Sequence, residues 1–428
     1  MSEAAELAEL TQHAAQRRVA FPQPDGSCVP YSVFSSQEVY EREQERIYRG
    51  PHWNFVALAC EIPNVNDFKS TFVGDTPVVV TRTANGFACW VNRCAHRGAV
   101  VCREKYGNAS SHTCVYHQWN YSCEGDLQGV PFRRGQKQGG TMLIGMAKAF
   151  NPAEHGLQKL RVEAYKGLVF ATFSDETPPL IDYIGPQMLP WVDRVFHKPI
   201  VFLGCTRQYS KSNWKLYLEN VKDPYHASLL HLFHTTFNIF RVGMSARSIP
   251  DETHGLHSLI TVTKPIADTN TATAYTDQKI RSMQEGFALE DPAVLGQISE
   301  FDEDCTNHIQ PIFPQLVIQQ IHNTLVARQL LPKGPNNFEL IFHFFGYEDD
   351  TQELRDLRLL QTNLVGPAGY ISMEDTEATE LVQRGTVRDG DKTSYIGMGL
   401  DAPEQTNSNI TENLIRRFWT GYQKAMGY

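Results

Sequence analysis

Two short motifs of cysteine and histidine constrain this chain most: Cys94 with His96, and Cys114 with His117. Two thiolates and two imidazoles can hold a tetrahedral zinc ion, or a 2Fe–2S cluster with both cysteines on one iron and both histidines on the other. Each motif contains one residue of each kind, so each loop can give one ligand to each iron. Structural zinc sites more often pair Cys with Cys and His with His. The pattern therefore favours an iron–sulfur redox centre.

The residues around the motifs read Cys-x-His-Arg-Gly and Cys-x-Tyr-His-x-Trp, which resembles the sequences of Rieske iron–sulfur proteins. Cys102 and Cys123 flank the motifs without a histidine at the right spacing, and we predict that they are free, buried thiols. The chain has nine cysteines, an odd number scattered over its length. This argues against a disulfide framework and favours a reducing compartment, so we expect the protein in the cytoplasm.

Length and composition set the broad class. With 428 residues and 41% apolar residues, the chain can form two or three domains with substantial cores. The net charge of −9 and the lack of a long basic run make nucleic acid an unexpected partner. The sequence has no run of about eighteen apolar residues, so it predicts no membrane span. The first residues also lack the basic and apolar regions of a secretory signal.

Hydrophobic patterning divides the chain into three parts. Residues 1–48 are predicted to be a largely helical extension, with Ser36 as the N-cap of a helix that runs to residue 48. Residues 49–175 contain short β-rich runs separated by turns, typical of a small antiparallel β domain. The predicted strands here are 54–59, 68–72, 77–83, 87–91, 160–164 and 168–173. Residues 176–428 begin after a Pro-rich boundary and mix strands at 317–321, 324–330 and 339–346 with helices at 354–362 and 410–426. The fold class is therefore α+β.

A second candidate site lies in the segment 213–231. A helix is predicted over 214–220, and Pro224 must break or restart it. His226 and His231 are five residues apart, which on a regular helix separates them by ~140°. Both can reach one ion only if the backbone departs from a regular α-helix between them. Asp223 in the same segment and the upstream redox centre favour a metal site over a structural histidine pair.

A third ligand would complete a 2-His-1-carboxylate site of the kind that non-haem Fe(II) oxygenases use. The candidates are Glu374 and Asp375, which follow a strand-like run after Gly366. Spacing alone leaves the choice between the two carboxylates open. Three ligands on one face would leave the opposite positions for O₂ beside a substrate.

The three motifs in this order resemble the large (α) subunit of Rieske non-haem iron aromatic-ring-hydroxylating oxygenases, across essentially the whole chain. The resemblance implies an N-terminal antiparallel β Rieske domain and a C-terminal catalytic domain whose antiparallel sheet is covered by helices. It also implies the cluster ligands and the iron ligands, with Asp375 as the carboxylate. These ligands are Cys94, His96, Cys114 and His117 for the cluster, and His226, His231 and Asp375 for Fe²⁺.

The resemblance also implies partners. Asp223 matches the aspartate that bridges an iron-ligating histidine to a cluster-ligating histidine of a neighbouring subunit, here His117, so the family works as a trimeric ring, either a homotrimer or α₃β₃ with a small β subunit. Electrons come from NADH through a separate reductase and a ferredoxin, and no G-x-G-x-x-G fingerprint in this chain suggests a reductase of its own. The basic, glycine-rich run 133–140 is either a solvated loop or a docking site for an acidic electron donor.

The substrate prediction depends on Arg328, which interrupts a largely apolar strand pattern. If it points inward, its guanidinium can bind a ring carboxylate bidentately; if outward, it is solvated or paired with an acidic neighbour. His234 and Asn220 could bond a group ortho to that carboxylate, and both are equally compatible with structural roles.

Within the family, the local sequence resembles oxygenases that act on benzoates, namely anthranilate, salicylate and terephthalate. Terephthalate needs a second cation, where this chain has the neutral run 406–409. We therefore expect anthranilate, oxidised with O₂ to catechol with loss of CO₂ and ammonia. The alternatives are a salicylate, terephthalate or other benzoate oxygenase. Two other classes are an electron carrier without the second site and a zinc-stabilised binding protein.

Overall fold

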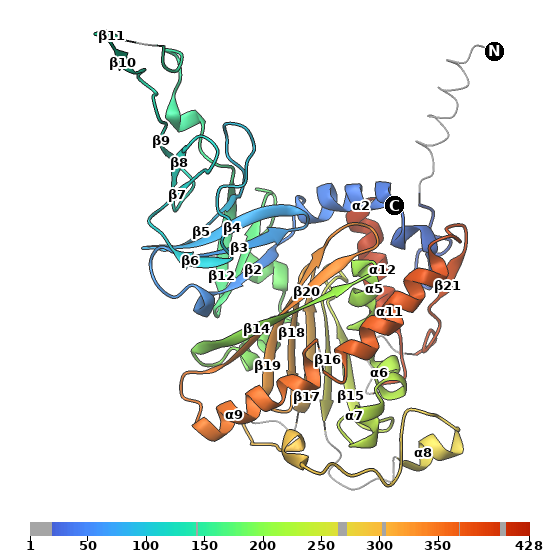
Figure 1. Cartoon of the computed structure of the whole chain (residues 1–428). Helices are drawn as coiled ribbons and strands as arrows, with labels where there is room; N and C mark the ends of the chain where they lie inside the picture. Colours follow the sequence, from blue (N-terminus) through green and yellow to red (C-terminus); the bar gives the residue numbers. More distant parts are fainter. Residues whose placement is uncertain (1–18, 143, 264–271, 302–304, 368, 403–407) are drawn as a thin grey trace, which may run out of the picture.

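The computed structural model describes residues 19–142, 144–263, 272–301, 305–367, 369–402 and 408–428, and two antiparallel seven-stranded sheets organise them (Figure 1). The first sheet has the order β2-β13-β12-β5-β4-β3-β6. Its strands are β2 (Asn54–Leu58), β3 (Asp67–Val73), β4 (Thr76–Thr83), β5 (Gly86–Val91), β6 (Tyr106–Asn108), β12 (Lys159–Tyr165) and β13 (Leu168–Thr172). All six strands predicted between residues 54 and 173 are confirmed.

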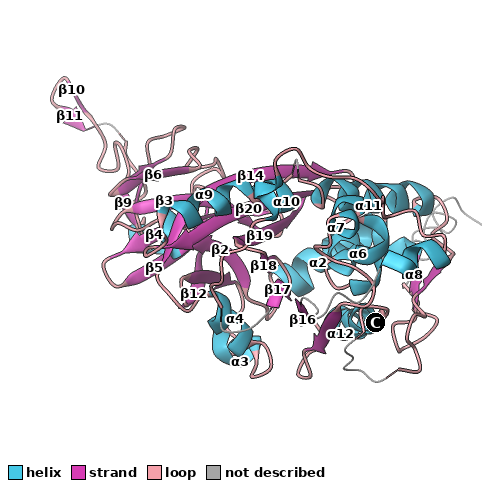
Figure 2. Ribbon diagram, turned by 90° about the horizontal axis from the view of Figure 1, so that it is seen from below, coloured by secondary structure: helices cyan, strands magenta, loops and turns pink. Residues whose placement is uncertain are grey.

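A smaller sheet extends the first half. It consists of β7 (Ser111–Thr113), β8 (Asn120–Ser122) and β9 (Leu127–Gly129), and the hairpin of β10 (Lys137–Gln138) and β11 (Thr141–Met142) follows it. In both views the hairpin projects away from the body of the protein (Figures 1 and 2). The basic run 133–140 lies in this projection. Val79 of β4 packs with Trp90 and Tyr121 in a core that joins the smaller sheet to the first one.

The second sheet has the order β14-β20-β19-β18-β17-β16-β15. Its strands are β14 (Ile200–Ser210), β15 (Ser245–Pro250), β16 (Ser258–Thr263), β17 (Cys305–Ile312), β18 (Leu316–Ile321), β19 (Thr324–Pro332) and β20 (Phe338–Tyr347). The three strands predicted after residue 316 are confirmed. Residues of β17 to β20 are almost all buried because both faces of the sheet are covered.

Helices cover the two faces of this sheet (Figure 2). Those described in the second half are α3 (Leu180–Ile184), α4 (Leu189–Val195), α5 (Trp214–Asn220), α6 (Pro224–Leu230), α7 (Leu232–Thr236), α8 (Ala272–Asp277), α9 (Gln352–Leu360), α10 (Thr362–Val365), α11 (Ser372–Thr386) and α12 (Asn413–Met426). On one face, Val317 and Val326 of the sheet pack with Trp214 of α5 and Phe418 of α12. On the other, Ile318 and Leu325 pack with residues of α3 and α4. Among the described residues, no helix combines the length and apolar character needed to cross a membrane.

The N-terminal expectation is confirmed only in part, and residues 1–18 lie outside the described residues. Ser36 caps α2 (Gln37–Glu43) by accepting from the N–H of Val39 at 3.3 Å, and one π-helical turn continues to Tyr48. The expectation of a largely helical segment is wrong for β1 (Cys28–Pro30), which pairs with β21 (Thr393–Tyr395). Strand pairing with a segment so distant in the chain overrides local propensity.

A buried ion network joins the two halves. The Lys69 Nζ of β3 lies 2.7 Å from Glu61 Oε2, and both side chains are at most 3% exposed. His343 Nδ1 of β20, in the second sheet, lies 3.0 Å from Glu61 Oε1. Tyr106 Oη donates to the same oxygen at 2.8 Å. The carboxylate of Glu61 is thus shared between the two sheets, and it fixes their relative position.

We expect Lys69→Met to lower the free energy of unfolding by about 3–5 kcal/mol, because it leaves the Glu61 carboxylate buried without its cation. The matched control is Lys198→Met, since Lys198 pairs with Asp349 at 2.8 Å where both side chains are exposed, and a surface pair contributes about 1 kcal/mol or less. Urea unfolding followed by circular dichroism measures both. Equal losses in the two variants would contradict a special role for the buried pair.

Two buried histidines predict a pH dependence of stability. Burial, reinforced by neighbouring histidines, lowers the pKa of His52 from 6.5 to about 3. Burial likewise lowers the pKa of His257 from 6.5 to about 4, although Asp251 opposes the shift. Both rings are therefore neutral in the folded protein and gain a proton on unfolding once the pH falls below 6.5. Their contribution to stability is complete above that value and is lost as the pH falls toward 4.

The free energy of unfolding should therefore fall between pH 7 and pH 5, by roughly 1–2 kcal/mol for each ring. In His52→Phe, one ring no longer titrates, so the difference between the two pH values should shrink by about that amount. Urea unfolding at both pH values, on the protein and on the variant, measures the difference. An unchanged pH dependence in the variant would show that His52 takes up no proton on unfolding.

Candidate active site

Each cysteine–histidine motif lies in a tight turn that follows a strand. Cys94 and His96 come after β5, and Cys114 and His117 join β7 to β8. The first turn closes where the N–H of Gly98 donates to the carbonyl of Cys94 at 2.9 Å. Gly98 has a φ of 76°, a conformation that disfavours residues with a side chain. The glycine of the motif is therefore required by the shape of the loop.

The two turns face each other. The rings of His96 and His117 have centroids 4.6 Å apart, while Cys94 and Cys114 are buried and free. Tyr121 Oη lies 3.2 Å from Cys94 Sγ, where it can donate to a thiolate. A 2Fe–2S cluster with two thiolates on its inner iron and two imidazoles on its outer iron fits this set of donors. Cys102 and Cys123 are buried and free as predicted.

The histidines of the second constellation come together through a break in the helix. Asp223 caps α6, since its Oδ1 accepts from the N–H groups of Tyr225 at 2.8 Å and His226 at 3.3 Å. His231 follows the last residue of α6 with φ −83° and ψ 87°, outside the helical region. The predicted departure from a regular α-helix between His226 and His231 is therefore confirmed, and it occurs at His231.

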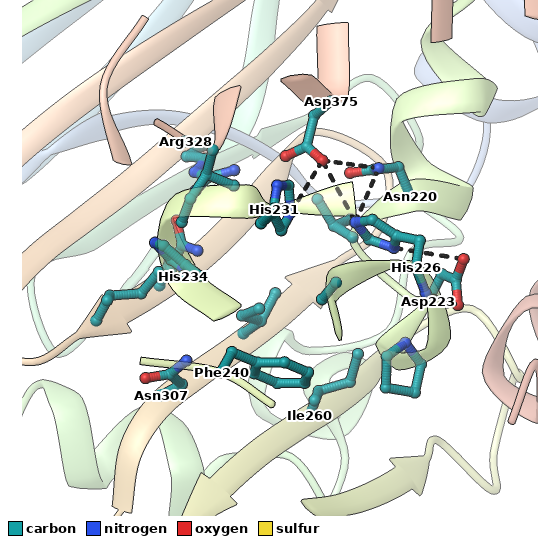
Figure 3. Close-up of a pocket in the computed structure, with 17 residues that line it drawn as sticks. Asn220, Asp223, His226, His231, His234, Phe240, Ile260, Asn307, Arg328 and Asp375 are labelled. Atoms are coloured by element: carbon teal, nitrogen blue, oxygen red, sulfur yellow. Dashed lines mark hydrogen bonds and ion pairs between the residues drawn. The ribbon is translucent and has the colours of Figure 1, made fainter. Parts of the chain in front are cut away.

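Asp375 is the carboxylate that faces both rings (Figure 3). Its Oδ1 lies 3.3 Å from His226 Nε2 and 3.4 Å from His231 Nε2. One ligand atom from each residue lies within 4.8 Å of the others, and Asn220 Nδ2 donates to the same carboxylate oxygen at 3.0 Å. Two imidazole nitrogens and one carboxylate oxygen in this arrangement can hold a divalent iron on one face.

Glu374, the other carboxylate that spacing left open, lies on the outer side of His231. Its Oε2 is 2.8 Å from His231 Nδ1, so the ring N–H can donate to it while Nε2 faces Asp375. Asp223 Oδ2 stands in the same relation to His226 Nδ1, at 3.3 Å. A carboxylate on Nδ1 orients each ring and fixes its tautomer, as second carboxylates do for metal-ligating histidines.

Three carboxylates around two imidazoles make this centre attractive to positive charge. Burial by itself lowers the pKa of His226, but Asp223 and Asp375 outweigh it and raise the pKa to about 10. Burial raises the pKa of Asp375, and the two imidazoles and Asn220 outweigh it and lower the pKa to about 2. A divalent cation at Nε2 would supply the positive charge that a proton otherwise brings, so the donor set fits a metal ion.

A pocket lies beside this centre, and its apolar lining residues are Val221, Pro224, Ala227, Phe240, Ile260, Ile309, Ile321 and Ile371. Arg328 enters it from β19 and is 1% exposed, so of the two orientations that the sequence left open, the structure has the inward one (Figure 3). Its Nη1 donates to Tyr217 Oη at 2.5 Å, whereas its Nε and Nη2 have no hydrogen-bond partner among the described residues. A buried guanidinium with two unused donors is costly unless an anion binds it.

Two further predicted residues also line the pocket. His234 is 2% exposed, and burial lowers its pKa well below the usual range, so its ring is neutral. Its Nε2 has no partner in the part of the chain described. Asn220 donates to Asp375 and lies 3.2 Å from His226 Nε2, so its amide supports the ligand cluster.

The neutral C-terminal run expected opposite Arg328 is only partly visible, because residues 406 and 407 lie outside the described residues. Ser408 and Asn409 are not among the residues that line the pocket. Asn409 Nδ2 donates instead to the carbonyl of Arg241 at 3.1 Å.

Sequence reasoning missed three residues of this site: Tyr217, Asn307 and Gln319. The signal for Gln319 was the one that identified Arg328, a polar residue within a largely apolar strand, whereas Asn307 lies in a strand with several polar residues and gave no such signal. Only the strand register shows that Gln319 and Arg328 share a face of the sheet, because Val317 pairs with Arg328 and Gln319 follows two residues later on β18. The role of Tyr217 follows from its contact with Arg328 alone.

Comparison with known proteins agrees with this geometry. Residues 52–141 match the Rieske [2Fe-2S] domain, and residues 204–427 match the catalytic domain of the ring hydroxylating alpha subunit. The chain is 74% identical to the anthranilate 1,2-dioxygenase large subunit of Burkholderia cepacia over 96% of each chain. It is 44% identical to a terephthalate 1,2-dioxygenase alpha subunit of Comamonas sp. (93% of this chain, 95% of the relative). It is 39% identical to the large oxygenase component of a salicylate 5-hydroxylase of Ralstonia sp. (95% and 96%).

Among solved structures, naphthalene 1,2-dioxygenase from Rhodococcus sp. has the same fold. It aligns with a TM-score of 0.77 at 23% identity, over 93% of this chain and 94% of the other. The chain therefore belongs to the large (α) subunits of the Rieske ring-hydroxylating oxygenases, which are oxidoreductases. Members of this family carry a Rieske 2Fe–2S cluster and a mononuclear iron, and they act as the oxygenase component of oligomeric, multicomponent systems that receive electrons from separate proteins.

We expect Glu374→Gln to weaken Fe²⁺ binding by about 10–100-fold, because an amide orients and polarises the His231 ring less well than a carboxylate. Glu377→Gln, an exposed position on the same helix α11, is the matched control. Competition with a chromophoric chelator measures the affinity of the full chain. Equal affinities in the two variants would show that Glu374 does not position His231.

Proposed function

We propose that this chain is the catalytic large subunit of an anthranilate 1,2-dioxygenase. The reaction takes anthranilate, O₂, NADH and two protons to catechol, CO₂, ammonia and NAD⁺. Both oxygen atoms add to the ring carbons that carry the carboxylate and the amine. The observation that carries the proposal is the buried, incompletely bonded guanidinium of Arg328, which faces an apolar pocket beside the His–His–Asp centre. The relative that is 74% identical supports the same substrate.

In this proposal Cys94, His96, Cys114 and His117 hold the cluster, and His226, His231 and Asp375 hold the iron. When bound, the cluster supplies single electrons and the iron activates O₂. The protein's own residues position these groups. Asp223 and Glu374 orient the two imidazoles through their Nδ1 atoms. Asn220 donates to Asp375 and so keeps that carboxylate directed at both rings.

Arg328 is proposed to bind the substrate carboxylate through Nε and Nη2, while Tyr217 holds Nη1. The apolar wall would exclude water and keep the ring flat beside the iron. Arg328 is the single Lys or Arg among the described residues that line the pocket. One cation suits a ring with one carboxylate, which favours anthranilate over terephthalate as the substrate. A neutral His234 would add no second charge.

We further propose that electrons reach the iron from the cluster of a neighbouring copy. Within one chain, the small sheet β7–β9 lies far from helices α6 and α7 in Figure 1, and its strand β9 lies far from them in Figure 2. His117 of a neighbouring copy would bond Asp223, whose Oδ2 already contacts His226. This implies a trimeric ring, either a homotrimer or α₃β₃ with a small β subunit. The exposed basic run 133–140 is proposed as the docking site for the ferredoxin or reductase.

The proposed domain division is 1–48, 49–175 and 176–428. It is supported by the gap between β13, which ends at Thr172, and α3, which begins at Leu180. We place the protein in the cytoplasm because its nine cysteines are all free.

A single turnover tests the proposed function. In four separate reactions, the iron-loaded, chemically reduced protein is mixed with O₂ and with one substrate: anthranilate, salicylate, terephthalate or benzoate. We expect catechol and ammonia in equal amounts from anthranilate. A diol from terephthalate, or hydroxylation of salicylate with no reaction of anthranilate, would contradict the proposal.

Arg328→Met should lower kcat/KM for anthranilate by about 100-fold, because two charge-assisted hydrogen bonds to the carboxylate are lost. Arg194→Met is the matched control, since Arg194 donates to Gln320 Oε1 on the opposite face of the sheet. Steady-state kinetics with the electron-transfer partners measures both variants. Equal kcat/KM values in the two variants would exclude Arg328 as the carboxylate site.

A further inference from the structure

Gln319 presents an unused hydrogen-bond acceptor to the pocket. Its side chain is 2% exposed and lines the same pocket as Arg328. Its Oε1 is buried, and no hydrogen-bond partner for it exists in the described residues. A buried amide oxygen without a partner is destabilising, so such a group in a packed interior points to a ligand that completes it.

Strand register places Gln319 next to Arg328. On β18 and β19, Val317 pairs with Arg328 and Gln319 pairs with Val326. Residues two apart on a strand point to the same side, so Gln319 is the diagonal neighbour of Arg328 on the pocket face. Diagonal neighbours are within reach of long side chains. A group bound to Arg328 therefore has the amide of Gln319 beside it.

A second amide lies one diagonal step further from Arg328. Asn307 on β17 pairs with Ile321, so it follows Gln319 in the same oblique row. Its Oδ1 is also buried without a partner among the described residues. Figure 3 shows Asn307 on the far side of His234 from Arg328. A substituent adjacent to the carboxylate would meet Gln319 and not Asn307.

The amino group of anthranilate is ortho to the carboxylate. With the carboxylate on Arg328, that amine lies against the guanidinium side of the pocket, and it carries two N–H groups. One N–H can bond the substrate's own carboxylate, and the other needs an acceptor on the protein. An arylamine gives its lone pair to the ring and acts mainly as a donor, so an amide oxygen suits it.

On the basis of the proposed function, we propose that the Gln319 Oε1 accepts a hydrogen bond from the ortho amine and thereby makes the site selective for 2-aminobenzoates. Gln319 is then a specificity-determining residue, distinct from Arg328, which binds any benzoate. The neutral His234 is the competing candidate, because its Nε2 also lacks a partner in the described part of the chain. The centroids of the His234 and His231 rings are 5.7 Å apart.

Equilibrium binding tests the inference without turnover. Dissociation constants for anthranilate and 2-methylbenzoate are measured by calorimetry on the full-length, cluster-containing protein under argon. The methyl group is close in size to the amino group, and only anthranilate has N–H groups. We expect the protein to prefer anthranilate by about tenfold or more, because the methyl group leaves Gln319 unpaired. In Gln319→Met, which keeps the length of the side chain, the ratio should fall close to one while 2-methylbenzoate binds at least as well.

Asn307→Leu is the matched control, since it removes the other unpartnered amide, and it should leave the ratio unchanged. A preference that persists in Gln319→Met, or one that is lost in Asn307→Leu or His234→Phe and not in Gln319→Met, would overturn the inference. Retained binding of 2-methylbenzoate shows that each variant is folded.

Catechol formation by the same preparation separates the two proposals. A protein that turns over anthranilate yet keeps its preference in Gln319→Met refutes only the role of Gln319. A protein that binds neither ligand and makes no catechol refutes both.

Discussion

The second half of this protein depends on one buried carboxylate, Asp375, facing two imidazoles. A carboxylate in an apolar interior is tolerated only when cations and donors surround it. His226, His231 and Asn220 provide them, and all three come from the segment where α5 ends and α6 begins and ends. The helix break is therefore essential to the site: a continuous helix would direct the two rings to different sides. Asp223 and Glu374 contact the Nδ1 atoms of the two rings, so Nε2 is the nitrogen that faces Asp375 on both.

The rest of the chain keeps this centre buried and in position. The second sheet forms the floor of the pocket, and helices on its other face seal the core. Glu61 ties the first sheet to the second through Lys69 and His343, so the two halves behave as one framework. The cysteine–histidine turns nevertheless lie at the end of the chain far from the His–His–Asp cluster, with His96 exposed. In the proposed function, this separation is the physical reason for electron transfer between neighbouring copies in an oligomer.

The pocket is recognisable by what its polar atoms lack. Most buried polar groups in a folded protein have a partner. Here Arg328, Gln319, Asn307 and His234 each keep an atom that has no hydrogen-bond partner among the described residues, and all four line one cavity. In the proposals made above, these atoms match a ligand with an anion at Arg328, a hydrogen-bond donor beside it and a flat apolar ring. Buried polar groups that folding leaves without partners are expected mainly at functional sites.

Much of this could be read from the sequence. The cysteine–histidine motifs, the His–His spacing around Pro224 and an arginine within an apolar strand are local patterns, and local chemistry determines which residues can be ligands and where the backbone must bend; that the arginine points inward was shown only by the structure. The strands and the α+β class followed from alternation and turn residues for the same reason.

The tertiary structure decided everything that depends on residues distant in the chain. It placed Asp375 against the Nε2 atoms of both rings and Glu374 against Nδ1 of His231. Spacing alone could not distinguish these two roles, because the two carboxylates are adjacent in the sequence. It paired β1 with β21, against the helical expectation, and it put Gln319 beside Arg328 through strand register. Spacing along a chain reports on one element at a time, whereas a pocket is made where several elements meet.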